Sequence, residues 1–144
     1  MILVSACLAG KTCRYNHSAA ADARIVELVR AGKALAACPE VLGGLSTPRP
    51  PAELQHGDGY AVLLGQAEVK TADGACVTEA FIKGAQETLR LCRVHGVTTA
   101  ILKANSPSCG CGKIYDGTFT GKLIDGVGVT AALLIQNGIA VDIV

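Results

Sequence analysis

The sequence predicts a small α/β protein in which a parallel β-sheet lies between layers of helices. Short apolar runs alternate along the chain with segments of helical periodicity, and Gly or Pro residues separate them. Parallel neighbours need crossover connections, which are usually helical. The chain has 144 residues, half of them hydrophobic, which suffices for one substantial core. We therefore expect a single domain over residues 1–144, a Rossmann-like three-layer sandwich.

The first part of the chain predicts two strands and a helix. Residues 2–6 are apolar and include β-branched side chains, which indicates a buried parallel strand ending at or near Cys7. Apolar positions recur at helical spacing over 20–31, which predicts an amphipathic helix. Residues 34–37 form a second short strand. It ends at Cys38, because the following proline cannot continue a central ladder.

The middle of the chain begins with an irregular segment, residues 43–51, whose Gly and Pro content is typical of a functional loop. Residues 60–77 are interpreted as a small hairpin with a turn at 72–74. A helix is then expected with Thr78 at its N-cap and Gly96 after its end. Its apolar face consists of Phe81, Ala85, Leu89 and Cys92.

The last part predicts the other two strands of the sheet. Residues 97–102 are β-branched and apolar and should form the third core strand. A loop is expected over 103–128 and a helix over about 129–136, and residues 139–144 should close the fold as a strand.

Composition excludes several classes of function. The formal net charge is +1 without a Lys/Arg run, and three Tyr, two Phe and no Trp leave few platforms for base stacking, so polymeric nucleic acid is not an expected partner. The apolar start lacks a basic n-region, and no apolar stretch reaches the roughly 18 residues of a membrane span. We expect a cytoplasmic protein without membrane contact, either a monomer or a small homo-oligomer.

Seven cysteines are many for such a chain, and three of them directly or closely follow predicted strands. These are Cys7, Cys38 and Cys109. All parallel strands point the same way, so the loops after them share one edge of the sheet, where α/β proteins bind ligands. Three thiolates there suit zinc, copper(I) or an iron–sulfur centre, and would leave a fourth ligand position open.

The remaining cysteines have weaker functional signals. Cys92 lies on the apolar face of a helix and is interpreted as a core residue, and Cys76 as structural. Cys13 and Cys111 lie close in sequence to Cys7 and Cys109. They could serve as substitute ligands or protect the site against oxidation, and the sequence leaves their role open.

Small and polar residues near these cysteines suggest further site positions. Residues 106–112 are rich in Gly and Ser, which either lets backbone approach a ligand or forms an ordinary tight turn. Glu40 follows Cys38 by two positions. It could act as a base or proton shuttle, or its carboxylate could simply accept hydrogen bonds from backbone N–H groups at a helix N-terminus. Three cations are candidates for binding a phosphate or carboxylate, or are simply surface charges: Arg14, Arg49 and Lys103.

Several of these segments together resemble the DUF523 family, which includes the bacterial thiouracil desulfurases. The resemblance covers essentially the whole chain. It is carried by residues 4–10, 14–15, 38–45, 48–49, 106–110 and 114–119.

The resemblance implies a 4Fe-4S cluster held by only three cysteines, here Cys7, Cys38 and Cys109. The fourth iron would then take the thione sulfur of a small thiolated pyrimidine such as 2-thiouracil, as free base or nucleotide. The C–S bond would break hydrolytically, without net redox change, and the sulfur would leave as sulfide. Glu40 and Ser106 match the family's polar active-site positions, which implies proton transfer or water activation for Glu40 and orientation of water or substrate for Ser106.

The chain departs from the family pattern at two places. Asn16 and His17 stand where the family commonly has an acidic residue and a glycine, and Cys111 is an additional cysteine. Two other functions use the same three cysteines: a non-catalytic carrier of a cluster or of sulfide, and a zinc or thiol-redox protein. Neither accounts for Glu40 and Ser106.

Overall fold

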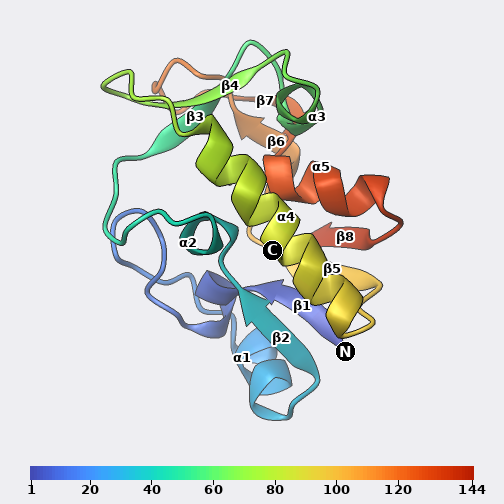
Figure 1. The fold of residues 1–144 in the computed structure, drawn as a ribbon. Coiled ribbons are helices and arrows are strands. Elements are labelled where there is room, and N and C mark those ends of the chain that lie inside the picture. The colour runs from blue at the N-terminus through green and yellow to red at the C-terminus, as the bar shows by residue number, and fades with distance from the viewer.

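A four-stranded parallel sheet forms the centre of the molecule, as the order of elements predicts. The computed structural model describes residues 1–144, and the sheet has the strand order β2-β1-β5-β8 (Figure 1). Its strands are β1 (Ile2–Ser5), β2 (Ala34–Ala37), β5 (Thr99–Leu102) and β8 (Ala140–Ile143). The strand order reverses between β1 and β5, so the carboxyl ends of these strands mark the place where this fold class binds ligands.

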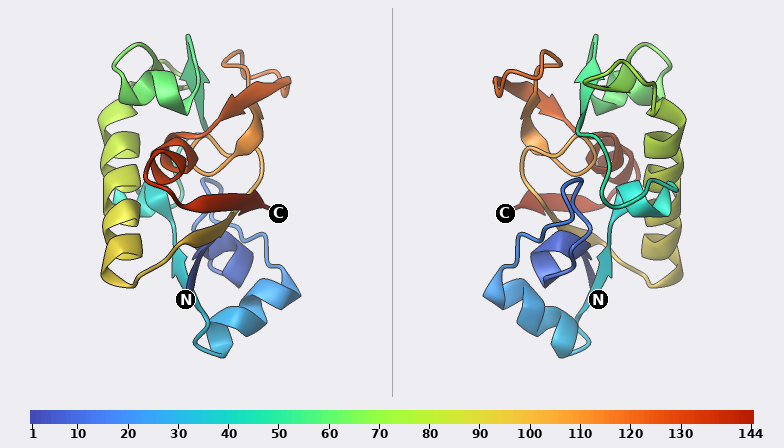
Figure 2. Two further views of the ribbon diagram at one scale, coloured as in Figure 1. Left: turned by 90° about the vertical axis from the view of Figure 1, so that its right-hand side faces the viewer. Right: turned by 90° about the vertical axis from the view of Figure 1, so that its left-hand side faces the viewer.

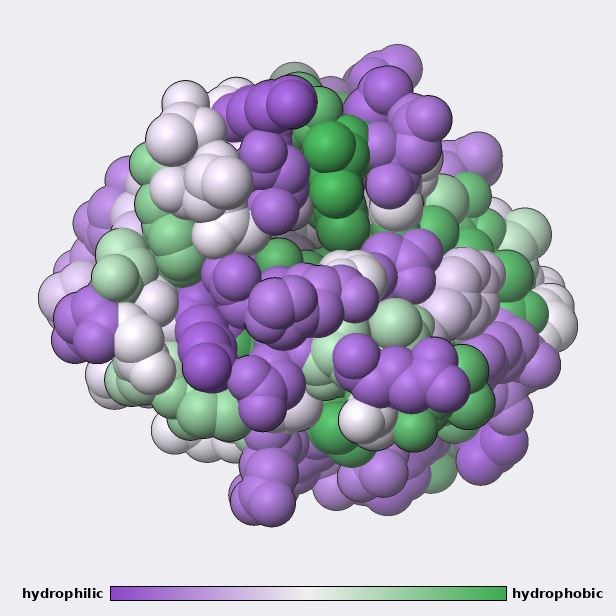
Figure 3. Space-filling model, turned by 90° about the horizontal axis from the view of Figure 1, so that it is seen from above, coloured by the Kyte–Doolittle hydropathy of each residue, from purple (hydrophilic) through white to green (hydrophobic).

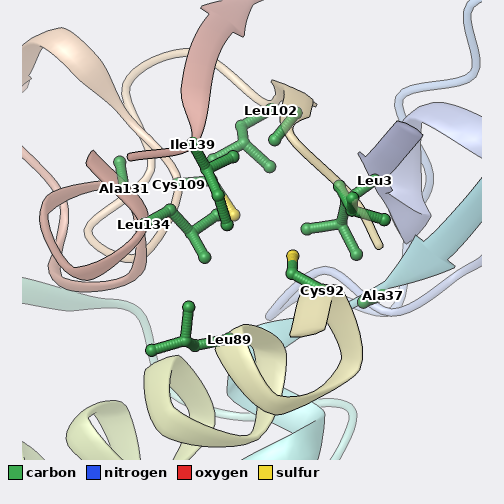
Figure 4. Close-up of a cluster of buried hydrophobic side chains, with 11 residues drawn as sticks. Leu3, Ala37, Leu89, Cys92, Leu102, Cys109, Ala131, Leu134 and Ile139 are labelled. Atoms are coloured by element: carbon green, nitrogen blue, oxygen red, sulfur yellow. The ribbon is translucent and has the colours of Figure 1, made fainter. Parts of the chain in front are cut away.

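Helices cover both faces of the sheet, which confirms the three-layer prediction. The long α4 (Thr78–Val94) and α5 (Val129–Gln136) lie on one side, and α1 (Ala23–Arg30) lies on the other (Figure 2). Successive strand residues point to opposite faces. Leu3 therefore packs in the core with α4 and α5, shown in Figure 4, and Val4 packs in the core under α1.

The predicted helices are present, with different starts. Asp22 caps α1 by accepting a hydrogen bond from the Arg24 N–H at 3.0 Å. The N-cap of α4 is Val77, so the assignment of that position to Thr78 is wrong. The Thr78 hydroxyl instead accepts a hydrogen bond from the Val69 N–H at 2.9 Å, which ties the start of α4 to a neighbouring strand.

The hairpin predicted over 60–77 is wrong in its first half. Strand β3 (Ala52–Gln55) pairs antiparallel with β4 (Glu68–Thr71), and a short helix, α3 (Gly59–Leu63), lies between them. Asp58 starts this helix because its carboxylate accepts hydrogen bonds from the N–H groups of the first turn. The predicted turn at 72–74 is present.

The loop predicted over 103–128 contains a second hairpin. Its strands are β6 (Cys111–Tyr115) and β7 (Leu123–Val127). Only Ile114 is fully buried among their residues, so the alternation that signals a half-buried strand is missing from the sequence. Figure 3 views the end of the molecule that carries both hairpins, and hydrophilic side chains cover most of this surface.

Two short helices follow the first two strands and were not predicted. The 3₁₀ helix η1 (Ala6–Ala9) continues from β1, and α2 (Pro39–Leu42) continues from β2. None of the helices has the length and apolarity that a membrane span requires.

Helix α2 lies against α4 at a contact without side chains. A β-carbon added at Gly84 would overlap the carbonyl oxygen of Pro39, and one added at Gly43 would overlap that of Ala80. Two glycines therefore let the backbones of the two helices touch. This contact fixes the position of α2, the element that follows Cys38.

We expect Gly84→Ala to lower the free energy of unfolding by about 1–3 kcal/mol, because overpacking outweighs the gain of about 1 kcal/mol in helix propensity. Urea denaturation measures the effect. The matched control is Gln86→Ala, at an exposed position of the same helix, which should leave stability nearly unchanged. A Gly84→Ala variant as stable as the wild type would contradict the close contact.

Candidate active site

The structure brings Cys7, Cys38 and Cys109 together around one cavity of about 50 Å³. Cys7 lies in η1 directly after β1, and Cys38 is the N-cap of α2 directly after β2. Cys109 comes from the loop after β5. The three loops meet because parallel strands deliver their carboxyl ends to one edge. No three His, Cys, Asp or Glu side chains have the arrangement that a single metal ion requires.

Burial and neighbouring groups give the three thiols different acidities. Burial raises the pKa of Cys109 to about 12, against the opposing effect of hydrogen bonds from the Ser5 and Ser106 hydroxyls. The pKa of Cys38 is raised mainly by a hydrogen bond with Cys13 and, to a smaller extent, by burial. A hydrogen bond from Cys13 lowers the pKa of Cys7. Binding a metal centre here must therefore displace protons from at least Cys38 and Cys109.

The other cysteines separate into distinct environments. Cys13 lines the same cavity and hydrogen-bonds with both Cys7 and Cys38, so it is a fourth sulfur at the site. Cys92 is fully buried in the core, as predicted (Figure 4). Cys111 lies on β6, half-buried against the same core and not at the cavity. Cys76, expected to be structural, is exposed and its sulfur lies 3.1 Å from the Thr78 hydroxyl.

Glu40 lies in the first turn of α2 and lines the cavity, where it pairs with Arg49. The Arg49 Nε donates to Glu40 Oε1 at 3.1 Å, and the side chains are only 5% and 17% exposed for Arg49 and Glu40 respectively. Glu40 makes no capping contact to a backbone N–H, so its position is fixed by the arginine.

Arg49 also ties three segments of the site to one another. Its Nη2 donates to the Cys13 carbonyl at 2.9 Å, and its Nη1 donates to the Ser46 carbonyl and the Thr47 hydroxyl, both at 3.1 Å. These partners occupy four of its five N–H donors, which favours an internal role over binding an external phosphate or carboxylate. Sequence reasoning missed this role, since no spacing rule connects Arg49 with Glu40 or Cys13.

Ser106 organises the loop that carries Cys109. Its Oγ accepts hydrogen bonds from the N–H groups of Ser108 and Cys109, each at 3.1 Å. Both acceptor positions are then occupied, and the single hydroxyl proton is directed toward the Cys109 sulfur at the cavity that Ser106 lines.

A larger open cleft of about 530 Å³ adjoins the cysteine cavity, and the two share five lining residues. These are Arg14, Glu40, Arg49, Lys103 and Ser106. Its size lies within the usual range for a small-molecule site. Arg14 and Lys103 form no ion pair, so two of the three cations noted in the sequence face the cleft without a carboxylate partner.

Comparison with known proteins gives a consistent assignment. The family model described as "2-thiouracil desulfurase" matches residues 2–143. The uncharacterized protein YbbK of Bacillus subtilis (strain 168) is 56% identical over 138 residues, which is 96% of this chain and 91% of YbbK. The solved structure of the [4Fe-4S]-dependent thiouracil desulfidase TudS is similar with a TM-score of 0.87 at 44% identity, over 99% of this chain and 89% of that one.

Proposed function

Because the chain belongs to the 2-thiouracil desulfurase family, we propose that it removes sulfur from a thiolated pyrimidine with a 4Fe-4S cluster held by Cys7, Cys38 and Cys109. The observation that carries this proposal is the arrangement of the two adjoining cavities. Three cysteines, a carboxylate and a serine hydroxyl surround the inner cavity, and the outer cavity is large enough for a small molecule.

The donor set fits the cluster. Cysteine thiolates are the usual ligands of iron–sulfur centres, and the three come from separate loops around one cavity. A single zinc ion uses the same kind of ligand, so iron, sulfide and zinc analysis distinguishes the two centres.

When bound through three cysteines, the cluster supplies a Lewis-acidic iron with an open position for the thione sulfur. The overall reaction adds one water: the carbon–sulfur bond is replaced by a carbon–oxygen bond and hydrogen sulfide leaves. Atoms balance without an oxidant or reductant.

Glu40 is the group that can take a proton from the attacking water. Its ion pair with Arg49 holds the carboxylate in one orientation at the wall between the two cavities. Ser106 can turn its hydroxyl proton from the Cys109 sulfur to the water or to the substrate, because its acceptor positions are engaged by backbone N–H groups. A carrier of cluster or sulfide would need neither residue nor the outer cleft.

The direct test is to incubate the anaerobically prepared, cluster-loaded chain with 2-thiouracil and to quantify uracil and sulfide. Equal molar amounts of the two products are expected. Absence of both products, with the cluster intact, would favour the carrier function. The same assay with a thiolated uridine monophosphate shows whether the free base or the nucleotide is preferred.

We expect Ser106→Ala to reduce kcat at least about tenfold, within the range of a lost proton donor, and to lower the free energy of unfolding by about 1–2 kcal/mol because two backbone N–H groups lose their acceptor. Steady-state kinetics and urea denaturation measure the two effects. Ser106→Thr, which keeps the hydroxyl, should recover most of the activity, and full activity of Ser106→Ala with an intact cluster would exclude a catalytic role.

A further inference from the structure

The aromatic side chains of this chain are concentrated at the outer cleft. The chain has three Tyr, two Phe and no Trp. Three of these residues line the cleft: Tyr15, Tyr115 and Phe119. Of the other two, Phe81 is buried in the core and Tyr60 lies on α3. Three of the five aromatic residues of the chain therefore surround one small-molecule site.

Phe119 is held at the cleft in an unfavourable backbone conformation. Its φ is +58°, in the left-handed region that residues other than glycine seldom adopt. Such conformations persist where the surrounding structure enforces them, and they cluster at functional sites. Phe119 is half-buried and lies in the loop between β6 and β7.

A nearly buried carboxylate enforces this conformation. Glu53 on β3 is 8% exposed, and its Oε1 accepts hydrogen bonds from the Gly117 N–H at 2.9 Å and the Phe119 N–H at 3.2 Å. The neighbouring Gln55 donates from Nε2 to the Gly117 carbonyl at 2.9 Å. Gly117 has a φ of +92°, and a β-carbon there would come within 2.7 Å of the Leu54 carbonyl oxygen. The β3–β4 strand pair thus holds the tip of the β6–β7 hairpin.

We propose that Phe119 is the platform on which the heteroaromatic ring of the substrate stacks, and that Glu53 is the residue that positions it. The inference rests on the proposed function and adds its means of recognising the ring. Aromatic side chains stack on pyrimidines regardless of ring substituents, so Phe119 contributes affinity for the ring. Phe119 is the one aromatic residue in the cleft without a hydroxyl and with an enforced backbone.

Substitution of Phe119 tests the platform. Replacing a stacking aromatic side chain by alanine weakens the affinity for a base by about 10- to 100-fold. Phe119→Ala should raise KM for 2-thiouracil by this factor while kcat changes less than about threefold. Phe119→Trp should keep KM near the wild-type value, and Phe119→Leu, which is apolar without a ring face, should resemble Phe119→Ala. Wild-type KM in Phe119→Leu would overturn stacking.

Substitution of Glu53 tests the positioning role. Glu53→Gln keeps an oxygen that can accept both N–H groups, so KM should stay near the wild-type value. Glu53→Ala should raise KM as Phe119→Ala does, and the double variant should add little further. Independent effects of the two substitutions would overturn the positioning role. The control is Tyr60→Ala, which removes an aromatic side chain outside the cleft and should leave KM unchanged.

Equilibrium dialysis with radiolabelled uracil separates this inference from the proposed function. Uracil binding by the cluster-loaded chain that weakens in Phe119→Ala, together with no turnover of 2-thiouracil, would reject the proposed function and keep the platform. Normal turnover with unchanged KM and unchanged uracil binding in Phe119→Ala would reject the platform alone. Neither turnover nor binding in the wild type would reject both.

Discussion

Replacing Cys7, Cys38 or Cys109 singly by alanine is expected to abolish both the cluster and the desulfuration activity. Anaerobically prepared wild-type chain should contain about four irons and four acid-labile sulfides, with absorption near 400 nm. Each variant should lose these features, because two thiolates from separate loops leave the inner cavity without a complete set of ligands. Iron and sulfide analysis with an absorption spectrum measures the result.

Cys76→Ala is the matched control, since it removes an exposed cysteine away from both cavities. It should keep full cluster content and activity. Cys13→Ala is informative beside it, because Cys13 lines the cavity without being among the three proposed ligands. A cluster that survives loss of Cys109 but not of Cys13 would reassign the ligand set. A colourless wild-type protein with stoichiometric zinc would reject the proposed chemistry.

The second large effect is expected for Glu40→Gln, which should lower kcat by about 10²–10⁴-fold, the usual contribution of a general base, while cluster content stays at the wild-type level. The amide has nearly the shape of the carboxylate but cannot accept a proton from water. Steady-state desulfuration kinetics and iron analysis on the same preparation measure both quantities.

Glu68→Gln provides the control, because Glu68 forms an exposed ion pair with Lys70 on β4. This variant should be indistinguishable from wild type. Arg49→Gln distinguishes the role of Glu40 as a base from its role in the ion pair, because it keeps the Glu40 carboxylate but removes its partner. Breaking a buried ion pair costs about 3–5 kcal/mol, so the free energy of unfolding should fall together with kcat. Wild-type kcat in Glu40→Gln would exclude the carboxylate from proton transfer.

The sheet and the meeting of its loops could be predicted from the sequence because both follow from local patterns. Buried parallel strands are short, continuous apolar runs, as in Ile2–Ser5 and Ala34–Ala37, and their direction alone brings Cys7 and Cys38 to one edge. The helix α4 could be predicted in the same way, because its buried apolar residues recur at helical spacing from Phe81 to Cys92.

The two hairpins could not be predicted in the same way. Strands β6 and β7 present mostly exposed or half-exposed residues, so their pairing depends on backbone hydrogen bonds, and these leave no periodic trace in the side chains. The hairpin predicted over 60–77 includes the apolar run at 61–64, although the capping carboxylate of Asp58 precedes this run and marks a helix start. Recognising that cap would have corrected the assignment.

Two buried charges were beyond sequence reasoning for a different reason. Arg49 reaches Glu40 and the Cys13 carbonyl, and Glu53 reaches two N–H groups across a gap of more than sixty residues. Such contacts join segments that only the tertiary structure brings together. A charged residue beside Pro in an irregular segment, as Arg49 is, gives no indication of its partner.

Helix α4 joins two hydrophobic cores, one beside strands β3 and β4 and one beside the central sheet, into one stiff unit. Its 17 residues extend about 25 Å, and Figure 1 shows it running without interruption from the hairpins to the sheet. Phe81 and Ala85 pack in the hairpin core, and Leu89 and Cys92 pack in the sheet core. A hinge motion between the two cores would have to break this helix or expose the buried side chains that it contributes to one of them. We therefore expect ligand exchange to depend on movements of side chains and loops at the cleft entrance.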